Sequence, residues 1–187
     1  MLKPIFNSNP IKILFIGAHC DDIEIGCGGT LLKFIREYEI EEVTWVVFSS
    51  NPTRKNEAIS SSNSFLKNVS NKNIMIKEFR DGFFPYNATK IKEYFEELKG
   101  ICYPDLIFTH YKHDYHQDHR LLSELTKNTW RNHMIFEYEI PKYDGDMGNP
   151  NFYVELEKGD IQNKVNYLVE AYSSQKGKHW FDQDLFY

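Results

Sequence analysis

The sequence predicts an α/β fold with a Rossmann-like, doubly wound and mostly parallel β-sheet flanked by helices. Short apolar runs alternate along the chain with longer segments of helical periodicity, an order typical of βαβ units. The chain has 187 residues, of which 41% are hydrophobic and 16% aromatic, so it can bury a sizeable core. We find no internal repeat or linker, and we therefore expect one domain over residues 1–187.

The first half of the chain predicts three strands separated by two helices. Residues 11–17 form an apolar run that indicates the first strand, and residues 43–48 and 73–79 indicate the second and third. Between the first two strands, apolar residues fall at helical spacing from Leu31 to Tyr38. A Ser- and Asn-rich piece follows the second strand, but its apolar stripe from Ala58 to Val69 still indicates a helix, stabilised by packing rather than by propensity.

The second half continues this alternation of helices and strands. A charged amphipathic pattern predicts a helix over 88–99, and a run that starts at a proline predicts a strand over 104–109. After these we expect a helix over 120–130, strands over 134–140 and 152–156, and a helix that begins with Asp160 as its N-cap.

Composition excludes several classes of function. The formal net charge of −5 provides no broad basic face, which argues against nucleic acids and anionic membranes as partners. The three cysteines, Cys20, Cys27 and Cys102, have no CxxC spacing, which argues against a disulfide framework and against a thiolate zinc site. Neither an export signal nor a membrane-spanning run is evident. We expect a cytoplasmic protein without membrane insertion, and leave self-association into a homo-oligomer open.

Metal-type ligands gather directly after the first predicted strand. His19 offers an imidazole, and Asp21 and Asp22 offer carboxylate oxygens. This mixture of nitrogen and oxygen donors suits zinc better than calcium or magnesium. A lone histidine after a strand is more often a structural residue, so this cluster alone does not establish a metal site.

A second cluster follows the strand over 104–109, where four of the seven histidines occur between His110 and His119. In a doubly wound sheet, ligands bind beyond the carboxyl ends of neighbouring strands. If the strands over 11–17 and 104–109 are neighbours, His19 and Asp22 face His116 and His119 across about a hundred residues of sequence.

The segments AHCDDIEIGCGGTL and HDYHQDH resemble the two signatures of the LmbE-like (PIG-L) family of zinc-dependent N-acetylglucosaminyl de-N-acetylases, which are AHPDD with a nearby glutamate, and HPDH. The resemblance implies the LmbE-like fold. It extends over most of the chain, to Arg54 and Glu57, Asp81-Gly82, Pro104-Asp105 and Ser174-Gln175.

By motif position, the resemblance implies one catalytic zinc ion per chain, bound by His19, Asp22 and His119. Three protein ligands leave a coordination position open, as catalytic zinc requires. The resemblance also implies that Asp21 is the general base and that His116 stabilises the oxyanion.

Three further side chains receive roles by the same comparison. Asp118 is expected to hold the His116 imidazole in its working orientation. Arg54 and Asp81 are expected to bind the substrate, although a solvated pair with Glu57 and a simple turn cap are the alternatives for these two residues. His110 and His113 are interpreted as outer or solvated residues.

The implied reaction removes the acetyl group from an N-acetylated amino sugar, free or linked to a nucleotide, glycan or lipid, and releases acetate and a free amine. The partner is thus a small-molecule or glycan substrate. Two alternatives stay open: a zinc amidohydrolase that acts on a non-sugar N-acyl group, and a metal- or sugar-binding module without catalysis.

The chain departs from the family pattern at two places. Cys20 replaces the customary proline between His19 and Asp21, and we expect the ligand geometry to survive this change. The family usually continues beyond the Ser-Gln element. A chain that stops at Tyr187 is therefore expected to be truncated or a short member, and to lack a wall of the pocket.

Overall fold

A parallel β-sheet forms the centre of the computed structural model, which describes residues 4–6 and 10–187. In this part of the chain the strands lie in the order β3-β2-β1-β4-β5, and each neighbouring pair is parallel. Their bounds are β1 Ile11–Gly17, β2 Ile40–Val47, β3 Lys72–Ile76, β4 Leu106–His110 and β5 Met134–Tyr138. The predicted doubly wound α/β fold is confirmed, and β1 and β4 are neighbours as expected.

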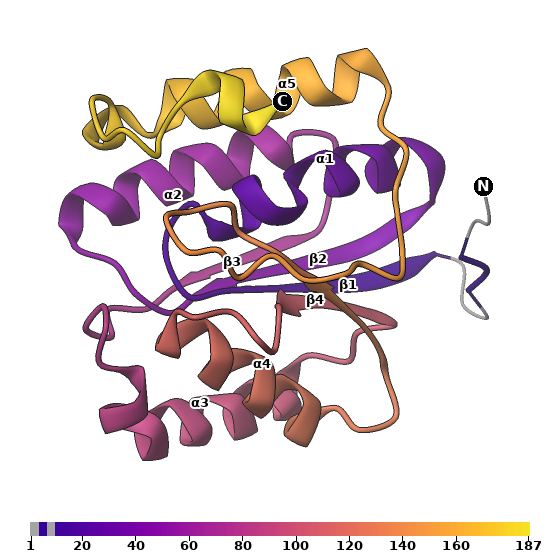
Figure 1. Ribbon diagram of the computed structural model, residues 1–187. Coiled ribbons are helices and arrows are strands. Elements are labelled where there is room, and N and C mark those ends of the chain that lie inside the picture. Colours follow the sequence, from indigo (N-terminus) through magenta and orange to yellow (C-terminus); the bar gives the residue numbers. More distant parts are fainter. Residues whose placement is uncertain (1–3, 7–9) are drawn as a thin grey trace.

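Helices cover both faces of the sheet (Figure 1). One layer holds α1, α2 and α5, and the opposite layer holds α3 and α4. Their bounds are α1 Asp22–Glu37, α2 Pro52–Phe65, α3 Ala88–Ile101, α4 Gln117–Thr129 and α5 Lys158–Ala171, with short 3-10 turns at Phe84–Asn87, Ser173–Gln175 and Gln183–Phe186.

The central strand β1 is buried on both faces. Ile13 and Phe15 pack into the core on the α1 side, whereas Leu14 and Ile16 pack into the core on the α3 side. Side chains of a strand alternate between its two faces, so a strand covered by two helical layers is apolar throughout. The same packing fixes the carboxyl ends of β1 and β4, from which the site-bearing loops start.

One predicted strand is absent from the described sheet. Residues 152–156 form an irregular connection, although their sequence suits a strand. Phe152 stacks on Phe136 of β5, with ring centroids 4.7 Å apart. The segment therefore contributes a side chain to the face of the sheet and does not pair with its edge, which corrects the expectation.

Two helices begin earlier than expected. α5 begins at Lys158, so Asp160 lies in its first turn and pairs with Arg36 at 2.8 Å, where we expected an N-cap. α4 begins at Gln117, which places Asp118 and His119 in its first turn.

The described ranges contain no helix that is both long and apolar enough to cross a membrane. Most of the first eight residues, whose composition argued against an export signal, lie outside the described residues.

Candidate metal centre and active site

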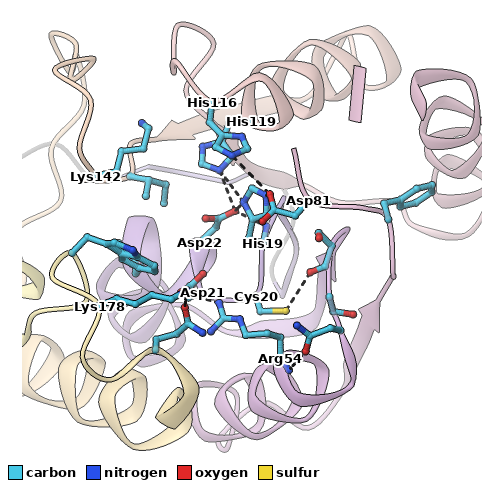
Figure 2. Close-up of a pocket in the computed structure, with 18 of the residues that line it drawn as sticks. His19, Cys20, Asp21, Asp22, Arg54, Asp81, His116, His119, Lys142 and Lys178 are labelled. Atoms are coloured by element: carbon cyan, nitrogen blue, oxygen red, sulfur yellow. Dashed lines mark hydrogen bonds and ion pairs between the residues drawn. The ribbon is translucent and has the colours of Figure 1, made fainter. Parts of the chain in front are cut away.

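Three predicted metal ligands meet at the carboxyl ends of β1 and β4 (Figure 2). His19 Nδ1 lies 3.2 Å from His119 Nε2 and 3.3 Å from Asp22 Oδ2, and His119 Nε2 lies 3.5 Å from the same oxygen. Ligand atoms about 2.0–2.2 Å from a tetrahedral zinc ion lie about 3.3–3.6 Å apart. The triangle formed by these three atoms therefore fits an ion of this size.

The outer nitrogens of both histidines have carboxylate neighbours, and Asp22 Oδ2 has a backbone donor. His119 Nδ1 lies 2.9 Å from Asp114 Oδ2, and His19 Nε2 lies 3.0 Å from Asp81 Oδ1. The His19 backbone N–H donates to Asp22 Oδ2 at 2.6 Å. When the outer nitrogens carry the protons, two unprotonated nitrogens face each other, an arrangement that a cation stabilises.

Asp114 contacts the predicted ligand His119, a contact that the sequence did not predict. It is buried, and its Oδ1 accepts a hydrogen bond from the His116 backbone N–H at 2.7 Å. The same oxygen forms an ion pair with Lys142 Nζ at 3.0 Å. Burial opposes ionisation, but His119 and the other donors outweigh it and lower the pKa of Asp114. The HDYHQDH pattern contains two aspartates, and nothing in it shows which one contacts a histidine.

Asp118 has contacts different from those expected. Its carboxylate accepts hydrogen bonds from the backbone N–H groups of Gly82, at 2.7 Å, and Phe84, at 3.0 Å. Its Oδ2 also lies 3.5 Å from His19 Nε2. Because Asp118 lies in the first turn of α4, its side chain fixes the loop that carries Asp81, and the expected orientation of His116 by this carboxylate is corrected.

His116 is oriented by backbone instead. Its Nδ1 accepts a hydrogen bond from the Asp118 backbone N–H at 3.2 Å, so a neutral ring carries its proton on Nε2. Burial, together with the nearby His119 and His19 imidazoles, lowers the pKa of His116. His116 also lines the cavity, where it can act as a neutral hydrogen-bond donor.

Asp21 and Arg54 form an ion pair at 2.9 Å inside the site. Burial raises the pKa of the Asp21 carboxyl above its usual value, and the Arg54 guanidinium partly offsets this rise. Arg54 also stacks over the Tyr172 ring, 4.8 Å from its centroid, and lies 3.5 Å from Glu57. Its guanidinium is therefore engaged with Asp21, a partner that we did not anticipate, and the Glu57 pair is not a solvated one.

Asp81 extends into the cavity beyond β3. Its side chain is 72% exposed, and Oδ1 lies 4.0 Å from His116 Nε2 in addition to its contact with His19. An exposed carboxylate beside two imidazoles is free to accept hydrogen bonds from a ligand.

The Cys20 side chain contacts the backbone that follows β2. Its buried thiol donates a hydrogen bond to the Ser49 carbonyl oxygen at 3.3 Å. Burial raises the pKa of Cys20 to about 12, so the group stays a thiol near neutral pH and does not compete as a thiolate ligand.

The two surplus histidines of the loop have different environments. His110 is buried, its Nε2 accepts a hydrogen bond from the Ala18 backbone N–H at 2.9 Å, and its ring stacks on that of His119 at 4.0 Å. His113 is exposed and lies outside the cavity lining.

The site opens into a cavity of about 690 Å³, a size that suits a small-molecule ligand. Beside the residues above, its wall contains the Ile140–Asp144 loop and three residues of the C-terminal segment, Gln175, Lys178 and Trp180. The C-terminal segment therefore supplies part of the cavity wall.

Residues 14–130 match the family model of PIG-L, described as GlcNAc-PI de-N-acetylase. The matched range contains both histidine and aspartate clusters of the site.

Solved structures with the same fold include N,N'-diacetylchitobiose deacetylase from Pyrococcus horikoshii, with 20% identity, a TM-score of 0.66, and coverage of 94% of this chain and 74% of that chain. A deacetylase of the teicoplanin biosynthesis pathway has 15% identity, a TM-score of 0.71, and coverage of 92% and 89%. The 4-carboxy-2-hydroxymuconate hydratase GalB from Pseudomonas putida has 12% identity, a TM-score of 0.70, and coverage of 94% and 82%. At these identities the likeness establishes the fold alone.

Proposed function

Because the chain belongs to the PIG-L family, it is a hydrolytic N-deacetylase, and we propose that it removes the acetyl group from an N-acetylated amino sugar with one zinc ion per chain. The sugar is free or linked to a nucleotide, glycan or lipid. The observation that carries this proposal is the triangle of His19 Nδ1, Asp22 Oδ2 and His119 Nε2, with Asp21 and His116 lining the same cavity.

His19, Asp22 and His119 would hold the metal. Two imidazole nitrogens and one carboxylate oxygen favour zinc over calcium or magnesium, and the three protein ligands leave a position open. When bound, zinc supplies Lewis-acid activation of water and of an acyl oxygen. Asp114 and Asp81 orient the two imidazoles through their outer nitrogens.

The protein's own groups move the protons and stabilise charge. Asp21 accepts a proton from the attacking water, and its raised pKa makes it a better base than an ordinary aspartate. His116 donates its Nε2–H to the oxyanion that develops on the substrate carbonyl oxygen. Asp21 then returns its proton to the departing amine, which releases acetate and the free amino sugar.

Arg54 and Asp81 have separate roles in this proposal. Arg54 keeps the Asp21 carboxylate in place through the 2.9 Å ion pair. Only the guanidinium N–H groups that do not face Asp21 remain to bind a substrate. Asp81 accepts hydrogen bonds from sugar hydroxyls with its exposed oxygen. We also propose a reducing, cytoplasmic location, which is supported by three unpaired, buried cysteines.

Acetate release coupled to metal analysis tests the proposal. The zinc-loaded protein is expected to release acetate from N-acetylhexosamines and not from N-acyl amino acids, and the opposite preference would favour the amidohydrolase alternative. Asp21→Asn is expected to retain zinc but lose turnover about 10²–10⁴-fold, the usual contribution of a general base.

His119→Ala is expected to lose zinc as well, because it removes one of three ligands. His113→Ala is the matched control, since this histidine of the same loop is exposed and lies outside the cavity. Full activity of Asp21→Asn, or purified protein without stoichiometric metal that still turns over, would contradict the mechanism. Zinc retention without any turnover would indicate the binding module.

A further inference from the structure

Lys178 is a cation of the cavity wall that the proposed chemistry does not use. The positively charged residues that line the cavity are Arg54, Arg80, Lys142 and Lys178. Arg54 is paired with Asp21, and Lys142 with Asp114 and Asp146. The exposed Arg80 stacks over the Phe83 ring, 3.6 Å from its centroid. Within the described part of the chain, Lys178 has no carboxylate at ion-pair distance, and its contacts are the Gln175 amide and the Trp180 ring.

A chain of hydrogen bonds holds the Lys178 ammonium in place. Lys178 Nζ donates to Gln175 Oε1 at 2.7 Å, and Gln175 Nε2 donates to Ser174 Oγ at 2.7 Å. Ser174 Oγ in turn donates to Glu57 Oε2 at 2.7 Å, and the Ser174 backbone N–H donates to Glu57 Oε1 at the same distance. Gln175 and Glu57 are buried, so the exposed Lys178 side chain is tethered through its ammonium to a buried chain of hydrogen bonds.

The ammonium is directed into the cavity. In Figure 2 the Lys178 side chain extends from the C-terminal segment toward the side of the cavity that holds Asp21, whereas His116 lies on the opposite side. Because an ammonium has three N–H donors and Gln175 takes one, the others remain for a ligand. The Asp21 charge is already compensated by Arg54, so the positive charge of Lys178 has no partner within the wall.

We infer that Lys178 is a specificity residue that binds an anionic group, a phosphate or a carboxylate, on the amino-sugar substrate. This inference rests on the proposed function. The acetamide carbon must sit beside Asp21, so the anionic group belongs to a substituent of the same sugar that reaches the C-terminal wall. Trp180, partly buried next to Lys178, offers an aromatic face for the sugar ring between these two points.

Three N-acetylglucosamine derivatives test the inference: the neutral methyl glycoside, the 1-phosphate and the carboxymethyl glycoside. Zinc-loaded wild-type protein is expected to favour at least one charged derivative over the neutral one. Lys178→Met is expected to reduce kcat/KM for that derivative about 10- to 100-fold, mainly through KM, and to leave the neutral substrate unaffected. Lys178→Arg is expected to retain most of the preference.

Lys176→Met is the matched control, because Lys176 is exposed on the same segment, lies outside the cavity wall, and gives the same change of net charge. Equal losses in Lys176→Met and Lys178→Met would overturn the inference, as would a wild type without preference for either anion. The charged derivative that loses more in Lys178→Met identifies the anion.

The test separates this inference from the proposed function. If no derivative releases acetate, the proposed function fails, and calorimetric binding of the same compounds to wild type and Lys178→Met still decides the inference. Weaker binding of only the charged compounds to Lys178→Met supports it, and equal binding overturns it.

Discussion

Replacing Asp114 with asparagine tests whether this buried carboxylate sets the proton position on a metal ligand. Its Oδ1 receives the His116 N–H at 2.7 Å and the Lys142 ammonium at 3.0 Å, whereas its Oδ2 lies 2.9 Å from His119 Nδ1. Asparagine keeps one acceptor oxygen, which is held by the two donors. The amide NH₂ then faces His119 Nδ1 and favours the tautomer that carries its proton on Nε2, toward the metal position.

We expect Asp114→Asn to weaken zinc binding about 10- to 100-fold, or about 1.4–2.7 kcal/mol, as is usual for an outer partner of a histidine ligand. The dissociation constant is measured by competition with a chromophoric chelator. Asp146→Asn is the control: the Asp146 side chain is only 3% exposed and pairs with Lys142 at 2.6 Å, but it has no contact with His119. An unchanged dissociation constant in Asp114→Asn, or an equal loss in Asp146→Asn, would refute the reasoning.

Three further predictions concern stability. Zinc at about 100 times its dissociation constant is expected to stabilise the fold by about 2.7 kcal/mol, measured by thermal unfolding before and after chelation, and an unchanged midpoint would contradict a folded-state metal site. Gly28→Ala is expected to lower the free energy of unfolding by about 1–3 kcal/mol in denaturant titrations, because its Cβ would lie 2.7 Å from Phe65 Cε1. Gly159→Ala, at a helical position with open space around it, should be neutral or stabilising, and equal effects of the two substitutions would count against this packing argument. Asn51→Ala is expected to cost about 0.5–2 kcal/mol, since the Asn51 side chain caps α2 at the Arg54 backbone N–H, and a loss well below this range would show that the cap contributes little.

The sequence was sufficient to predict where the two clusters meet. The apolar runs of β1 and β4 reflect burial on both faces, and such strands lie in the middle of a doubly wound sheet. The neighbouring carboxyl ends follow from this order, so His19, Asp22 and His119 could be placed together without coordinates.

The remaining features depended on side-chain directions that periodicity does not determine. Helix α4 begins three residues before its predicted start at residue 120. Asp118 therefore lies in its first turn, where its carboxylate binds the backbone at Gly82, and the contact with His119 is made by Asp114. In the same way, the pairing of Arg54 with Asp21 depends on how α2 approaches the end of β1, which no local pattern of residues encodes. The 152–156 segment had strand propensity, but its aromatic side chain packed on the sheet instead.

The three buried cysteines can be used to measure local unfolding of this protein. Burial raises the pKa of Cys20, Cys27 and Cys102, so an alkylating reagent reacts with them only when the surrounding structure opens. Cys27 belongs to α1 and packs into the core on that face of the sheet, and Cys102 packs in the core on the opposite face. Their separate labelling rates, read by mass spectrometry, therefore compare how often each helical layer detaches from the sheet, and Cys20 reports the same for the loop that carries the metal ligands.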